Sequence, residues 1–147
     1  MGEWMEKLKE KSFLFLFVAY GYACIEILWR GFTHWSMFLT GGFCFLTVHK
    51  FNISHHGSPL WKRCLAGSGI ITCTEFTVGV VVNLVMKLGV WDYSKTPFNI
   101  LGQVCLLYSF LWFLLCYPIT KLSDYMTSHL FRRPLGSEKR VQAVKAS

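Results

Sequence analysis

Two acidic residues, Glu26 and Glu75, stand inside long apolar runs of a 147-residue sequence and are the first candidates for chemistry. A carboxyl group is costly inside a membrane, so it normally faces other helices or a water-filled cavity. Arg30 follows Glu26 by one helical turn, which is close enough for an ion pair. Such carboxyl groups would bind a small polar or cationic ligand, or relay a proton. The alternative is a structural role, in which they hold helices together through hydrogen bonds.

Further polar residues follow the second carboxyl group. Asn83 falls on the same helical face as Glu75, two turns later, and a polar connection occupies residues 88–100. There we expect Asp92 or a neighbouring serine to accept hydrogen bonds from the backbone, and Asn99 to cap the next helix. Capping and turn formation alone are the alternative explanation. The candidates for a ligand or ion path are Glu26, Arg30, Glu75, Asn83, Asp92, Tyr93 and Asn99.

The elements that carry these residues are apolar helices. The sequence is 53% hydrophobic and 17% aromatic, with a mean hydropathy of +0.39, more than a soluble domain of this size can bury. A helix that crosses about 30 Å of hydrocarbon needs about 20 residues, so the second apolar run is short for a span. The first run lacks a signal-peptide cleavage motif, and we interpret it as a retained helix. The predicted spans are residues 13–29, 33–49, 65–88 and 98–119.

The distribution of basic residues predicts the orientation. Twelve of the fifteen Lys and Arg residues lie in the N-terminal segment, the connection between the second and third spans, and the C-terminal tail. Only Arg30, Lys87 and Lys95 remain for the other side. Because basic residues concentrate on the cytoplasmic side, we expect a multi-pass protein of the plasma membrane with both termini cytoplasmic.

The segment after the fourth span has apolar residues at helical spacing. We expect residues 121–131 to form an interfacial helix on the inner leaflet, with a continuation of the fourth span as the alternative. Residues 1–131 would form a single four-helix membrane domain, and residues 132–147 a polar, basic cytoplasmic tail.

The two halves of the chain resemble each other weakly. Cys24-Ile25-Glu26 in the first span corresponds to Cys73-Thr74-Glu75 in the third. The fold class expected is therefore all-α, a four-transmembrane-helix bundle built from two parallel two-helix repeats. The first and third spans would be neighbours, with their carboxyl groups at similar depth and facing inward. Because burial disfavours a charged carboxylate and no basic residue lies within a turn of Glu75, it would be the more readily protonated of the two.

Several function classes lack support in the sequence. There is no nucleophile–base pattern, phosphate-binding glycine loop or metal-ligand spacing, so we expect no enzyme, cofactor or metal site. The basic residues lie beside apolar runs, which indicates anionic lipids at the inner leaflet rather than nucleic acid. The six cysteines are expected to be reduced and buried. We expect His55 and His56 to be solvated, and Asn52-Ile53-Ser54, formally a glycosylation sequon, to be silent on the cytoplasmic side.

A family resemblance rests on dispersed residues. In the second half they are Glu75-Phe76, Gly79, Asn83, Trp91-Asp92-Tyr93-Ser94, Pro97, Asn99, Gly102-Gln103 and Trp112; in the first half, Gly21, Glu26, Gly31, Trp35-Ser36-Met37 and Gly41-Gly42. From about Val18 to Asp124 the chain resembles the "putative ABC-transporter type IV" (CmpB-like) family of small membrane proteins. Longer members carry an Arg-Gly and Gly-Pro…Pro-Ile-Tyr-Gly stretch after the first span that is missing here, so the chain is similar to a shorter subfamily.

Two functions remain open. The first is a small permease-like or transport-associated protein with a polar site around the two glutamates and an unknown small-molecule or ion substrate. Four helices enclose little volume, so such a protein would act as a homodimer or with a partner membrane subunit. The second is a non-transporting scaffold or subunit whose glutamates are structural.

Overall fold

The structure is a computed structural model that describes residues 2–135; residues 136–147 of the expected basic tail lie outside the described part. Long runs rich in Leu, Phe and Val form helices, and glycine or proline interrupts them near residues 31 and 57–59. The helices are α1 (Gly2–Arg30), α2 (Trp35–Ser54), α3 (Leu60–Gly79) and α4 (Leu106–Tyr125). A π-helical segment continues α3 as η1 (Val80–Val85), and another continues α4 as η2 (Met126–Leu130). Strands β1 (Asn99–Ile100) and β2 (Val104–Cys105) pair in antiparallel fashion.

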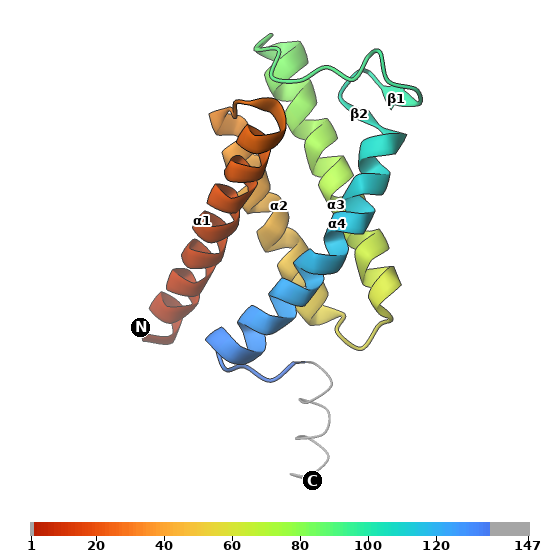
Figure 1. Ribbon diagram of the computed structural model, residues 1–147. Coiled ribbons are helices and arrows are strands. Elements are labelled where there is room, and N and C mark those ends of the chain that lie inside the picture. The colour runs from red at the N-terminus through yellow and green to blue at the C-terminus, as the bar shows by residue number, and fades with distance from the viewer. Residues whose placement is uncertain (1, 136–147) are drawn as a thin grey trace.

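The four helices form two hairpins, α1–α2 and α3–α4, and α2 lies between α1 and the second hairpin (Figure 1). The start of α1 and the end of α4 lie at one end of the bundle, which we call the terminal end. The long connection, residues 86–105, lies at the far end. The expected contact between the first and third spans is wrong, because α1 packs mainly on α2, while α2 contacts both α3 and α4.

Glycines explain why the hairpin partners approach closely. A Cβ atom added at Gly42 of α2 would lie 2.6 Å from the Phe15 ring of α1. One added at Gly67 of α3 would lie 2.8 Å from the Cys116 sulfur of α4. Small residues at such contacts let helix backbones come together where lipid offers no hydrophobic driving force.

Within residues 2–135, three helices are long and apolar enough to cross a membrane, namely Gly2–Arg30, Leu60–Val85 and Leu106–Leu130. Helix α2 has 20 residues but falls outside this group. Its last turns carry His49, Lys50 and Asn52, which lower its hydropathy. Many large apolar side chains are exposed on the helices, among them Leu28 at 87% and Val85 at 72%. So large an apolar surface on an all-α chain fits a protein that resides in a membrane.

Two expected boundaries in the last third of the chain are wrong. The fourth helix begins at Leu106 rather than near residue 98, since residues 98–105 form the β1–β2 hairpin. The segment at 121–130 is not a separate interfacial helix but continues α4 into η2. It stays with the bundle because Met126 packs in an apolar cluster with Leu14 of α1 and Phe45 of α2.

The cysteines are all free, but only four of them are buried. Cys44, Cys64, Cys105 and Cys116 are buried, whereas Cys24 and Cys73 are exposed on the outside of their helices. The expectation of burial was therefore wrong for these two. Both lie two residues before a glutamate, and this offset turns them away from the protein interior.

The close contact of the first hairpin leads to a stability prediction. Gly42→Leu would drive a side chain into the Phe15 ring, and we expect it to lower the free energy of unfolding by about 1–3 kcal/mol. Gly69→Leu in α3 is the matched control, because nothing lies within 4 Å of its added Cβ. Thermal unfolding of the detergent-solubilised protein measures both. Equal unfolding midpoints for the two variants would contradict the proposed packing role of Gly42.

Candidate functional site

Glu75 lies on the wall of a cavity that all four helices line. The cavity has a volume of about 60 Å³. Tyr22 of α1, Thr40 of α2, Glu75 of α3 and Trp112 of α4 contribute its polar groups, and most of the remaining wall is apolar. Because a water molecule needs roughly 10–15 Å³ of such volume, the cavity has room for a few waters or a ligand of a few heavy atoms.

The Glu75 carboxyl group is 4% exposed and accepts two hydrogen bonds from side chains. The Tyr93 hydroxyl donates to Oε1 at 3.2 Å, and the Trp112 indole N–H donates to Oε2 at 2.9 Å. Tyr93 belongs to the long connection and Trp112 to α4, so the carboxyl group ties α3 to both. Among the described residues no basic side chain forms an ion pair with Glu75. Its inward orientation agrees with the sequence prediction.

Glu26 has a different environment. Its carboxyl group, 6% exposed, pairs with Arg30 at 2.8 Å, as predicted, and accepts a hydrogen bond from the Thr33 hydroxyl. Arg30 also donates to the backbone carbonyl of Val90 at 3.2 Å, and its guanidinium lies 4.7 Å from the centroid of the Phe32 ring. This ion pair therefore fastens the end of α1 to the long connection.

The two carboxyl groups lie at different distances from the ends of their helices. Helix α1 ends four residues after Glu26, whereas η1 ends ten residues after Glu75. At 1.5 Å per residue this places them about 6 Å and about 15 Å from their helix ends. Glu26 does not line the cavity. Tyr22, one turn before Glu26, lines the cavity and lies within electrostatic range of both carboxyl groups.

Asn83 serves the long connection rather than Glu75. Its side chain donates to the Gln103 side-chain oxygen at 2.9 Å and accepts from the Val90 N–H at 2.7 Å. The Trp91 indole N–H donates to the Gln103 carbonyl at 2.9 Å. These bonds hold the connection against the end of α3, which favours the structural interpretation of Asn83.

The remaining candidates order the turn that carries Tyr93. Asp92 accepts from the Ser94 N–H at 2.8 Å and the Ser94 hydroxyl at 2.9 Å, as expected, and these bonds lower the pKa of the exposed Asp92 carboxyl group. Asn99 does not cap α4. It donates to the Thr96 carbonyl at 2.8 Å and accepts from the Gly102 N–H at 3.1 Å. Gly102 has a φ of +67°, and an added Cβ would lie 2.8 Å from the Asp92 carboxylate.

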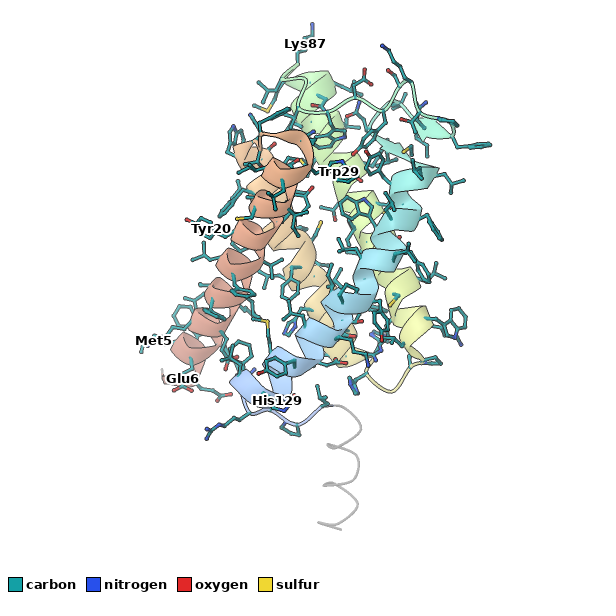
Figure 2. All side chains as sticks on the ribbon, in the orientation of Figure 1. Met5, Glu6, Tyr20, Trp29, Lys87 and His129 are labelled. Atoms are coloured by element: carbon teal, nitrogen blue, oxygen red, sulfur yellow. The ribbon has the colours of Figure 1, made fainter. Side chains whose placement is uncertain are left out.

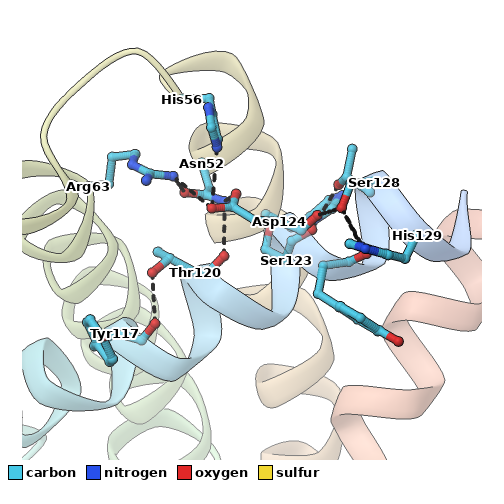
Figure 3. A network of polar contacts seen from close by, with 12 residues as sticks. Asn52, His56, Arg63, Tyr117, Thr120, Ser123, Asp124, Ser128 and His129 are labelled. Atoms are coloured by element: carbon cyan, nitrogen blue, oxygen red, sulfur yellow. Dashed lines mark hydrogen bonds and ion pairs between the residues drawn. The ribbon is translucent and has the colours of Figure 1, made fainter. Parts of the chain in front are cut away.

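A second polar cluster, at the terminal end, was not predicted from the sequence (Figure 3). The Arg63 guanidinium donates to the Asn52 oxygen at 2.6 Å and lies 3.4 Å from the Asp124 carboxylate. The Asn52 amide donates to Asp124 at 2.7 Å and to the Ser123 hydroxyl at 3.0 Å. His56 lies 3.4 Å from Asp124. The cluster joins α2, α3 and α4 through side chains from each.

Two expectations about this region change. His55 is exposed, as expected, but His56 is partly buried beside Asp124. Asn52 is 0% exposed and is hydrogen-bonded to residues of α3 and α4, so the sequon residue is part of the packed bundle. One feature of the sequence could have predicted this cluster. Arg63 and Asp124 each stand at the edge of an apolar run, where an ion pair between neighbouring helices is favourable.

Comparison with known families is consistent with this picture. The model of the family described as "Putative ABC-transporter type IV" matches residues 5–141. The chain belongs to this family. The match extends over nearly the whole sequence and includes the helices that line the cavity, the long connection and the terminal-end cluster. It agrees with the resemblance noted in the sequence. No solved structure matches the chain.

The terminal-end cluster leads to a second stability prediction. Arg63→Met leaves the Asn52 oxygen and the Asp124 carboxylate without the guanidinium, and we expect the free energy of unfolding to fall by about 3–5 kcal/mol. Adding Asp124→Asn should recover part of this loss, because it removes the unpaired charge. The control is Lys62→Met, the neighbouring exposed cation, which should change stability by less than about 0.5 kcal/mol. Chemical or thermal unfolding in detergent measures the stability of each variant. An Arg63→Met protein as stable as the Lys62→Met protein would contradict a stabilising role for the cluster.

Proposed function

We propose that the chain is a small permease-like component of a membrane transport system, and that the cavity at Glu75 binds its small cationic ligand or its coupling proton. One observation carries this proposal: a single carboxyl group stands in the wall of an otherwise largely apolar cavity that all four helices share. A carboxylate beside aromatic rings, here Trp112 and Tyr22, is the chemistry that recognises a small cation. The family description is in keeping with a role in transport.

Glu26 takes no direct part in this proposal. Its charge is compensated by Arg30 at 2.8 Å, whereas Glu75 has only neutral donors. A carboxyl group with neutral partners can exist with or without its proton, and so can exchange a proton or a cation. Glu26 stays paired with Arg30 whether or not Glu75 carries its proton. The two glutamates therefore have separate roles, binding for Glu75 and fastening for Glu26.

The proposal includes α2 as a fourth span in the plasma membrane, with both termini cytoplasmic. Its 20 residues measure about 30 Å, the thickness of the hydrocarbon core. The distribution of basic residues supports the orientation: most of them gather at the terminal end, where Glu6 and His129 lie, whereas Lys87 lies at the far end (Figure 2). The two hairpins would then be parallel repeats.

A cavity of about 60 Å³ does not make a continuous pathway. A complete route across the membrane would therefore need a conformational change, a second copy of the chain or a partner subunit.

The alternative function, a membrane scaffold, is favoured by one observation. Both oxygens of Glu75 already have a donor, as expected for a group that only holds helices together.

Substitution of Glu75 separates the two functions. Glu75→Gln keeps the shape and most hydrogen bonds but cannot ionise, so we expect flux of protons or methylammonium into proteoliposomes to fall to background. Thermal stability should change little. Glu75→Leu should lower stability as well, because Tyr93 and Trp112 lose their acceptor.

The matched control is Glu26→Gln, which removes the other buried carboxylate. It should lower stability, because Arg30 loses its partner, while the folded fraction keeps its flux. Wild-type flux in the Glu75→Gln protein would exclude the coupling role. Absence of flux for both probes even in the wild-type protein would favour the scaffold.

The orientation is tested by cysteine labelling in a background without native cysteines. We expect a membrane-impermeant maleimide to label Lys95→Cys from outside the cell and His55→Cys only after the cytoplasmic side is opened. Both positions are exposed, so access and not burial governs labelling. Labelling of position 95 from the cytoplasmic side alone would reverse the topology.

A further inference from the structure

A large groove opens on the terminal end of the bundle, far larger than the central cavity. It lies between the start of α1, the second half of α2 and residues 127–134 after α4. Its volume is about 580 Å³, within the range of sites that hold a small-molecule ligand. It does not include Glu75, so it is distinct from the cavity of the proposed function.

The groove carries an excess of positive charge. Lys7, Lys11, Lys50 and Arg133 line it, against a single acidic residue, Glu10. Glu10 pairs with Arg133 at 2.8 Å, and Lys7 pairs outside the groove with an exposed glutamate of α1 at 2.6 Å. Among residues 2–135, no carboxylate forms an ion pair with Lys11 or Lys50. Two ammonium groups from different helices therefore face the groove without a countercharge.

The polarity of the groove changes along its length. On α2 its wall passes from Lys50 to Leu46 and Phe43, and on antiparallel α1 it passes from Lys7 and Lys11 to the buried Leu14. Seven residues separate the basic and apolar ends on each helix, which is about 10 Å. Both helices thus place cations at the end of the bundle and apolar side chains one to two turns deeper.

We propose that this groove binds an anionic phospholipid of the inner leaflet, with the phosphate between Lys11 and Lys50 and an acyl chain along Leu46 and Phe43. The order of charge and apolar surface matches a phospholipid, whose anion lies at the interface and whose chain runs into the membrane. A free anion would use only the basic end. The placement on the inner leaflet depends on the orientation proposed above, and the labelling experiment tests that separately.

The C-terminal tail of the chain is a poor competitor for the same groove. Residues 136–147 contain three basic residues and one acidic residue, so their charge does not complement the basic rim. A second copy of the chain would bring the same basic surface and be repelled. An anionic lipid complements both the charge and the apolar floor.

Native mass spectrometry of the full-length protein in neutral detergent tests the proposal, with phosphatidylglycerol as the probe. We expect Lys11→Gln combined with Lys50→Gln to weaken its binding about tenfold or more. Lys9→Gln combined with Lys62→Gln removes the same charge from exposed positions outside the groove, and should change binding less than twofold. All four lysines are exposed, so both proteins should fold.

Three further comparisons make the outcome decisive. Phosphatidylcholine should bind much more weakly than phosphatidylglycerol, and glycerol phosphate, which has no acyl chain, should not compete. Deleting residues 136–147 should leave binding unchanged. Equal loss in the two double variants, effective competition by glycerol phosphate, or a large gain on removing the tail would each overturn the proposal. Equal loss would indicate non-specific attraction to positive charge. Competition by glycerol phosphate would indicate a site for a free anion, and a gain on deletion would indicate a groove that the tail occupies.

Discussion

The burial of the Glu75 carboxyl group is the constraint on which much of the far end depends. A carboxyl group 4% exposed among apolar helices needs donors within reach, and α3 itself supplies none. Trp112 provides one from α4, and Tyr93 provides the other from the long connection. Tyr93 can do so only if its loop is fixed, which explains the hydrogen-bonded turn at Asp92 and the left-handed Gly102 beside it. Glu75 thus contributes to ordering the long connection, together with the bonds from Asn83 and Arg30.

The terminal end follows the same principle with different residues. Arg63, 7% exposed, is held by Asn52 and Asp124, so that α2, α3 and α4 are joined by hydrogen bonds where their sequences become polar. Polar networks therefore fasten the bundle at both ends, and the middle is packed by apolar side chains around glycines. The small cavity lies between the two networks. Most of its lining is apolar, and Glu75 and Trp112 in its wall belong to the hydrogen-bond network of the far end.

What the sequence predicted correctly is mostly local in the chain. The pairing of Glu26 with Arg30 and the turn at Asp92 involve residues two to four positions apart, and helical periodicity or turn chemistry dictates them. The bonds from Trp112 to Glu75 and from Asn52 to Asp124 cross 37 and 72 positions. They depend on which helices pack together, and periodicity carries no information about that. The same limit explains why the position of α2 between α1 and the second hairpin was missed.

The basic residues at the terminal end show how charge counting conceals different physical roles. Counted for orientation, Arg63, Arg133 and Lys50 are equivalent. In the structure Arg63 is buried against Asn52, Arg133 is paired with Glu10, and Lys50 is exposed at the rim of the groove. A buried cation must be compensated within the protein, whereas an exposed one can exchange its partner for a lipid phosphate. Only an exposed cation can contribute to lipid binding. The basic residues that orient the chain and those that bind a ligand are therefore two sets that overlap only in part.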